Sequence, residues 1–101
     1  MVENNLTRAE IINLLHCEKA ILRNKFGVIS IGLFGSYVKN TNTKDSDVDL
    51  FVEFSQPRFE WIAGLQIYLE EKFGKRVEIV RKGAHLSKRF VNLVEKDIHY
   101  V

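Results

Sequence analysis

The spacing of apolar residues predicts a helix from about Arg8 to Lys25. Apolar side chains recur there with the 3.6-residue period of one helix face, at Ile11, Leu15, Leu22 and Phe26. Thr7 and Glu10 have the spacing of a capping box, in which each side chain satisfies a backbone amide at the start of a helix. Gly27 lies just past the last turn. The first predicted element is therefore an amphipathic helix with one buried face.

A polar loop separates two predicted strands. Val28 to Phe34 is rich in β-branched and aromatic residues and is short enough to be a buried strand. Gly35-Ser36 ends this strand, and residues 40–45 are all polar with turn preferences, with room for a short helical turn at residues 37–39. The loop leads into the second strand.

Side chains from Asp47 to Phe54 are expected to alternate between the two faces of a strand. One face of this strand carries Val48, Leu50, Val52 and Phe54, and the other carries Asp47, Asp49, Phe51 and Glu53. Because side chains two residues apart on a strand point the same way, the carboxylates of Asp47 and Asp49 are expected to share the face opposite the core.

The next predicted elements are a helix and a third strand. Pro57 suits the first turn of a helix, where its missing amide hydrogen costs nothing, and Gly74 marks the end of that helix. The core stripe of the helix is Ile62, Leu65, Leu69 and Phe73. In the strand predicted from Lys75 to Val80, Glu78 lies on the face opposite the core. Glu78 can therefore join the two aspartates.

A last helix is predicted from about Ser87 to Lys96, and residues 98–101 can form an edge strand. Together the elements predict one α/β (α+β) domain spanning residues 1–101, with a short mixed twisted sheet, helices on one face and the acidic site on the other. A length of 101 residues allows a single core, and 46% hydrophobic and 28% charged residues are ordinary values for a globular protein.

Some functions are disfavoured by composition. The longest apolar run is far shorter than the ~20 residues that a membrane-spanning helix needs, and no signal peptide is visible, so we expect a cytoplasmic protein without a membrane partner. The single cysteine, Cys17, is expected to be a buried thiol in the first helix rather than a reactive one. A net charge of +2 does not favour nucleic acid as a partner. From Lys72 to Arg89, however, the sequence contains seven lysines and arginines and only one acid. Such a basic rim would attract a triphosphate.

The residues from Gly35 to Asp49 combine a possible phosphate grip with a possible metal clamp. A Gly-Ser turn that leads into a helical turn presents backbone amides to phosphates, and Ser36 adds a hydroxyl and Lys39 a positive charge. Carboxylates on one strand face, with Glu78 from the next strand, suit divalent metal ions that prefer oxygen ligands. Two such ions can stabilise the attacking and leaving oxygens of a nucleotide transfer.

This arrangement resembles the signature of the DNA polymerase beta-like nucleotidyltransferases, namely Gly35-Ser36, ten intervening residues and Asp47-x-Asp49. The chain as a whole, from the first helix to the closing Ile-His-Tyr-Val, resembles a minimal nucleotidyltransferase of the MNT group. The resemblance implies that Asp47, Asp49 and Glu78 bind two Mg²⁺ ions and that Gly35 and Ser36 contact the terminal phosphates of the nucleotide. Lys39 is expected to help hold the phosphates of ATP.

The MNT group also implies a partner. Its members are commonly antitoxins of helical HEPN ribonuclease toxins, and they transfer AMP from ATP to a toxin tyrosine, which is the activity expected here. This chain departs from the group in having Glu78 where aspartate is common, and Lys39 where arginine is usual. Those departures motivate an alternative, a binding module that neutralises the toxin by complex formation alone. Transfer to nucleic acid or to a small molecule is a weaker hypothesis, because no second domain is present to hold such an acceptor.

Overall fold

The computed structural model describes residues 6–101, which form three helices and a four-stranded sheet. In chain order the elements are α1 (Arg8–Phe26), β1 (Val28–Phe34), β2 (Val48–Phe54), α2 (Phe59–Phe73), β3 (Val77–Arg81), α3 (Lys88–Glu95) and β4 (His99–Tyr100). The predicted fold class is confirmed, and every predicted helix and strand is present within a few residues of its expected bounds. The capping box of α1 forms as predicted, since Glu10 donates its backbone amide to the Thr7 hydroxyl and Thr7 donates its amide to the Glu10 carboxylate.

Two sequence predictions about the helices are wrong. The second helix begins at Phe59 rather than at Pro57, because Arg58 has extended backbone angles and serves as the N-cap. Cys17, expected to be buried, is exposed. It lies two residues beyond the buried Leu15, and two residues of an α-helix correspond to a rotation of about 200°. That rotation places the thiol on the solvent side of α1.

The strands lie in the order β3-β2-β1-β4. β1 pairs antiparallel with β2 and with β4, whereas β2 and β3 run parallel. The tail therefore forms an edge strand, as the sequence predicted. Because β2 is central, it has β1 on one side and β3 on the other.

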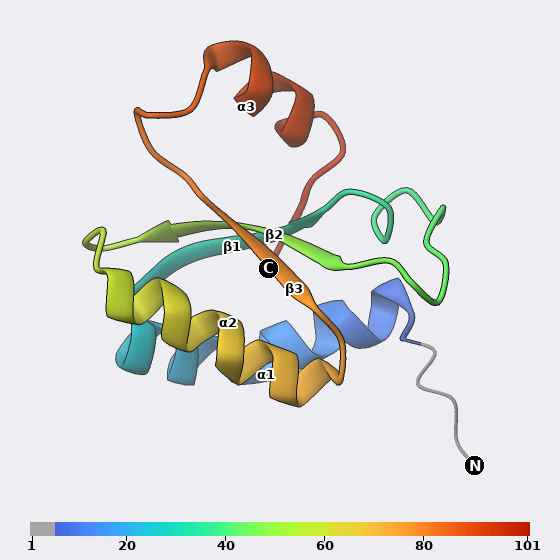
Figure 1. The fold of residues 1–101 in the computed structure, drawn as a ribbon, viewed down its shortest axis with the longest axis horizontal. Coiled ribbons are helices and arrows are strands. Elements are labelled where there is room, and N and C mark those ends of the chain that lie inside the picture. The colour runs from blue at the N-terminus through green and yellow to red at the C-terminus, as the bar shows by residue number, and fades with distance from the viewer. Residues whose placement is uncertain (1–5) are drawn as a thin grey trace.

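Figure 1 shows that α1 and α2 cover one face of the sheet while α3 lies on the opposite side. The main core lies between the sheet and the first two helices, where Leu15, Leu50 and Leu69 are fully buried. α3 is thus the one described helix on the side of the predicted acidic site, so the prediction that the helices all lie on the other face is wrong for α3. Within residues 6–101, no helix is both long and apolar enough to cross a membrane.

Candidate active site

The predicted phosphate grip is a compact turn at the end of β1. Residues 35–40 form consecutive turns closed by backbone hydrogen bonds, including Lys39 N to Gly35 O at 3.3 Å and Thr41 N to Ser36 O at 3.0 Å. Tyr37 anchors the turn in the core with only 1% of its surface exposed. The Arg8 side chain adds a tie from α1, donating to the Val38 carbonyl at 3.1 Å. Residues 37–39, where a short helical turn was expected, therefore form hydrogen-bonded turns rather than a helix.

The predicted acids lie on neighbouring strands, on the side of the sheet away from α1 and α2. Asp49 stands directly opposite Glu78 in the parallel register of β2 and β3. Asp47 immediately precedes β2 and is partly buried, whereas Glu78 is exposed. The structure thus brings Asp49 and Glu78 together as the strand alternation predicted.

Gly35 and Asp49 connect the grip to the acids. Gly35 has φ +77°, and a Cβ atom at this position would overlap the Asp49 carboxylate. Phe34, the residue before Gly35, pairs with Asp49 across the antiparallel β1–β2 ladder. A side chain at position 35 would thus be strained by the backbone and would also displace the carboxylate. The absence of a side chain at Gly35 is what lets the carboxylate lie against the turn.

The Asp49 carboxylate lies in a region of negative charge. Burial, followed by the charges of Glu78 and Asp47, raises the pKa of Asp49 from 3.8 to about 6. Like charges and desolvation both disfavour an ionised carboxylate, and a bound cation would relieve both effects. This cluster of hard oxygen donors therefore fits a divalent ion such as Mg²⁺.

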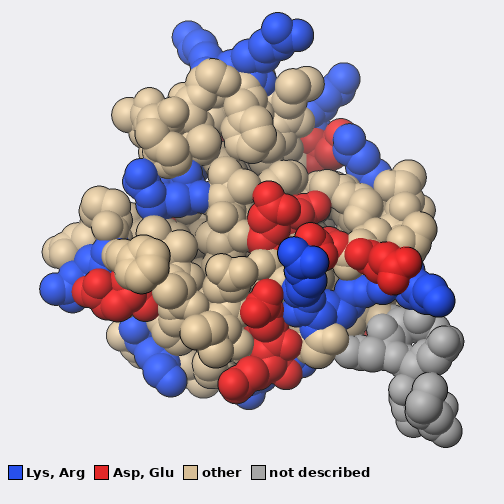
Figure 2. All heavy atoms as spheres, viewed as in Figure 1, with Lys and Arg blue, Asp and Glu red and all other residues tan. Residues whose placement is uncertain are grey.

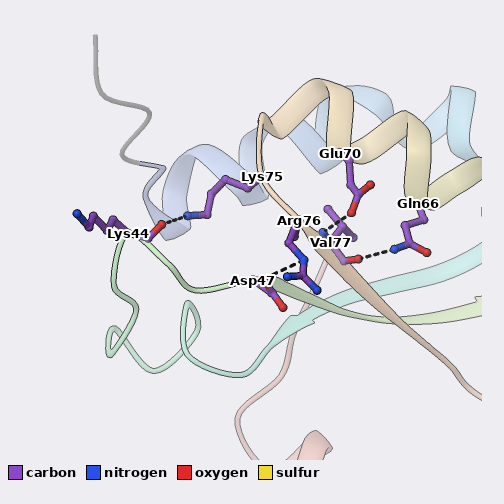
Figure 3. Close-up of polar contacts among 7 residues, drawn as sticks. All are labelled: Lys44, Asp47, Gln66, Glu70, Lys75, Arg76 and Val77. Carbon is purple, nitrogen blue, oxygen red and sulfur yellow. Dashed lines mark hydrogen bonds and ion pairs between the residues drawn. The ribbon is translucent and has the colours of Figure 1, made fainter. Parts of the chain in front are cut away.

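The Asp47 carboxylate faces a cation that the sequence did not pair with it. Its Oδ1 lies 4.0 Å from Nε of Arg76, whose side chain is 86% exposed (Figure 3). Strand alternation predicts that Arg76 lies on the same face as Glu78, and this was the one sign in the sequence that Arg76 could approach Asp47. The pairing of Arg76 with Asp47 itself depends on the parallel register of β2 and β3. Among residues 6–101 no three Asp, Glu, His or Cys side chains are gathered closely enough to hold a metal ion as they stand.

A scaffold of polar contacts fixes the start of β3 beside these acids (Figure 3). On α2, Glu70 accepts the amide of Val77 at 3.0 Å and Gln66 donates to its carbonyl at 3.1 Å. Lys75 Nζ donates to the Lys44 carbonyl at 2.8 Å, which ties the loop before β2 to the loop before β3. Sequence reasoning assigned no role to these residues. They hold the two strands that carry the acids in register.

The site side of the sheet is also partly covered by apolar groups. Phe51, predicted to share a face with the aspartates, is fully buried, and its ring meets Phe34 edge-on at 6.3 Å between centroids. Lys82 lies over the Phe51 ring and is 3.8 Å from Glu95 of α3. In Figure 2, acidic side chains gather beside the strands below α3, with basic side chains around them. The site side of the sheet is therefore accessible around the acids and is covered by side chains further along β2.

A rigid glycine turn held against strand carboxylates is the architecture of an enzyme that transfers nucleotides. Residues 19–99 match the nucleotidyltransferase domain family, and the chain belongs to that family. Its sequence is 40% identical to protein adenylyltransferase MntA of Thermococcus cleftensis over 97 residues, which cover 95% of this chain and 97% of the relative. The comparison confirms the nucleotidyltransferase resemblance.

Solved structures show the same fold. One, described as a candidate minimal nucleotidyltransferase, superposes with a TM-score of 0.79 at 25% identity, covering 94% of this chain and 96% of the other. A second is a chain from the complex of the tri-AMPylated HEPN toxin of Shewanella oneidensis with its MNT antitoxin. It gives a TM-score of 0.57 at 21% identity and covers 92% of this chain and 66% of that chain. At this identity the second likeness concerns the fold alone.

Proposed function

We propose that this nucleotidyltransferase transfers AMP from ATP to a tyrosine hydroxyl of a helical HEPN toxin and thereby acts as the antitoxin of a toxin–antitoxin pair. Support comes from the relative named as a protein adenylyltransferase, which matches along almost its whole length. The choice of a HEPN toxin as partner follows from the resemblance of this chain to the MNT group, whose members are commonly antitoxins of such toxins.

The observation that carries the proposal is the contact between the Gly35 turn and the Asp49 carboxylate. If Gly35 holds the terminal phosphates and Asp49 a cation, this contact supports the proposal by bringing the two sites together. In the proposed complex, Gly35, Ser36 and Lys39 hold the phosphates, and Asp47, Asp49 and Glu78 hold Mg²⁺, with two ions expected. Bound Mg²⁺ would neutralise the charge that develops on the phosphate oxygens.

In the proposed reaction the tyrosine oxygen attacks the α-phosphorus of ATP. A P–O bond to tyrosine forms, the bond to the bridging oxygen breaks, and pyrophosphate leaves with the electron pair. The tyrosine proton passes to a carboxylate of the cluster or to water. Attack and departure lie in line, so the acceptor approaches from the side opposite the pyrophosphate. Because the Gly35 turn lies on the β1 side of β2, the acceptor is expected from the β3 side, near Glu78 and Arg76.

The test is whether label from ATP labelled at the α-phosphate is transferred, in the presence of Mg²⁺, to the product of the adjacent gene once that gene is shown to encode a HEPN protein. The wild type should label the partner, and Asp47→Asn and Asp49→Asn should reduce labelling at least a hundredfold. Asp45→Asn is the matched control, since Asp45 is an exposed loop carboxylate two residues before Asp47. Absence of labelling by the wild type would refute transfer to this partner.

The same variants separate the enzyme from a binding module. A module that acts by complex formation alone would suppress the toxin in cells whether or not Asp47 and Asp49 are present. The proposed enzyme loses suppression when either aspartate is replaced, although it still binds the toxin.

A further inference from the structure

A small cavity adjoins the phosphate grip on the side of α3. Its volume is about 210 Å³, and Phe34, Gly35 and Lys39 form its floor at the end of β1. α3 supplies the opposite wall through Phe90, Leu93 and Val94, and Asp97 lies at the end of that wall. Leu93 leaves 64% of its surface exposed, although it lies beside a charged site. The cavity is therefore apolar at its centre and has one cation and one carboxylate among its lining residues.

The position of the cavity decides between two occupants, the acceptor tyrosine and the base of the nucleotide. Gly35 and Lys39, proposed to hold the departing pyrophosphate, also line the cavity. An acceptor that attacks in line cannot enter from the side on which the pyrophosphate leaves. A wider cavity of about 400 Å³, lined in part by Asp47, Lys75 and Arg76, lies on the β3 side and is open to the acceptor.

The base, by contrast, is attached to the phosphate chain through the ribose. The requirement for in-line attack restricts the acceptor and does not restrict where the base lies. Apolar and aromatic side chains with a few polar groups are the usual lining of such ligand sites. Stacking on an aromatic ring accepts any base, so a polar group is needed for selection. Asp97 can only accept hydrogen bonds when ionised, and it would select a base with an exocyclic amino group.

We propose that the cavity between the Gly35 turn and α3 is the base-binding site of this nucleotidyltransferase, in which Phe90 and Leu93 cover the ring and Asp97 selects the exocyclic amino group of adenine. This inference rests on the proposed function, because it takes the phosphates to be held at Gly35. It assigns to α3, the helix on the site side of the sheet, the recognition of the nucleoside. It also extends the specificity of the site beyond phosphates and metal.

The experiment compares the binding of ATP and of inorganic tripolyphosphate, each with Mg²⁺, by calorimetry. Tripolyphosphate has the phosphate chain but no base. Leu93→Ala should weaken the binding of ATP about tenfold, because the base would lose an apolar contact, and should leave the binding of tripolyphosphate unchanged. Ile67→Ala on α2 is the matched control, since Ile67 is 59% exposed and lies outside the cavity. Equal weakening of both ligands, or of neither, would overturn the proposal.

Selection by Asp97 is tested with inosine triphosphate, which lacks the amino group of ATP. The wild type should prefer ATP at least fivefold, and Asp97→Ala should remove the preference. If Leu93→Ala instead raises the KM for the toxin and leaves the KM for ATP unchanged, the cavity belongs to the acceptor and the proposal is wrong.

The two proposals fail in different ways. A wild-type protein that binds neither ATP nor tripolyphosphate refutes the nucleotide site as a whole. A wild-type protein that labels the toxin while Leu93→Ala keeps its affinity for ATP refutes only the base site. Methyl NMR of the wild type gives a check without any variant, because ATP should shift the Leu93 and Val94 methyl signals and tripolyphosphate should not.

Discussion

Replacing Asp49 by asparagine should stabilise the metal-free protein while it abolishes nucleotide transfer. The Asp49 carboxylate is partly buried and lies near Glu78 and Asp47, which raises its pKa from 3.8 to about 6. At pH 7 the carboxylate is ionised in both the folded and unfolded states, but its charge is less favourable in the folded state. Asparagine keeps the shape of the side chain and removes the charge.

The size of the effect follows from the pKa. Raising a pKa from 3.8 to about 6 corresponds to at most about 3 kcal/mol, because one pKa unit equals about 1.4 kcal/mol. Since the carboxylate is only partly buried, solvent screening reduces the expected gain in the free energy of unfolding to about 1–2 kcal/mol. This contribution opposes folding fully above about pH 6, and it disappears as the pH falls toward 3.8.

The assay is urea unfolding in EDTA between pH 7.5 and 4.5, with Asp45→Asn as the control. The free energy of unfolding of Asp49→Asn should exceed that of the wild type most at pH 7.5. The difference should shrink as the pH falls toward 4.5. Adding Mg²⁺ should then stabilise the wild type, since a ligand that binds only the folded state stabilises it, and should have little effect on the variant. A variant less stable than the wild type at pH 7.5, or a difference independent of pH, would refute the reasoning.

Three further substitutions and one control substitution test the scaffold and the site. Gly35→Ala should lower the free energy of unfolding by about 1–2 kcal/mol because of the left-handed backbone alone. The variant should also fail to bind ATP, because the new side chain displaces the Asp49 carboxylate. A variant with wild-type affinity for ATP would contradict this. Arg76→Ala should change the free energy of unfolding by less than about 1 kcal/mol, because exposed ion pairs contribute little. The same variant should bind Mn²⁺ severalfold more tightly in calorimetry. An unchanged Kd for Mn²⁺ would show that Arg76 does not compete with the ion for Asp47. Leu69→Ala should cost about 2–5 kcal/mol in urea unfolding as a fully buried core residue, and Ile67→Ala, exposed on the same helix, should cost under about 0.5 kcal/mol.

Local patterns were sufficient to predict most of the fold. The alternation along β2 and the helical period of α1 depend on neighbours a few residues away, so both elements were recognised from the sequence. Cys17 shows the limit of this reasoning, because it was assigned to the apolar pattern of α1 although it lies on the opposite side from Leu15. The start of α2 was also misplaced, since Arg58 rather than the residue before Pro57 adopts the N-cap conformation.

Contacts between distant segments could not be predicted in the same way. The facing of Asp49 and Glu78 followed from alternation once β2 and β3 were assumed to be neighbours. The pairing of Asp47 with Arg76 and the closeness of Gly35 to Asp49 depend on the register of three strands. The position of α3 depends on the path of the loop after β3, for which the sequence gives no period. The placement of Asp49 beside Glu78 was therefore predictable, whereas the contacts of Asp47 and of Gly35 were not.

The order of the strands gives the site two sides with different roles. β2 carries the aspartates in the middle, β1 leads into the Gly35 turn on one side, and β3 brings Glu78 and Arg76 on the other. If pyrophosphate leaves toward Gly35, in-line attack requires the acceptor to approach over β3. The exposed basic residues at the start of β3 would then meet the partner rather than the nucleotide, so a partner with acidic residues flanking its tyrosine would be favoured. In that case Arg76→Ala should raise the KM for the toxin and should not raise the KM for ATP. A raised KM for ATP with an unchanged KM for the toxin would show that Arg76 meets the nucleotide instead.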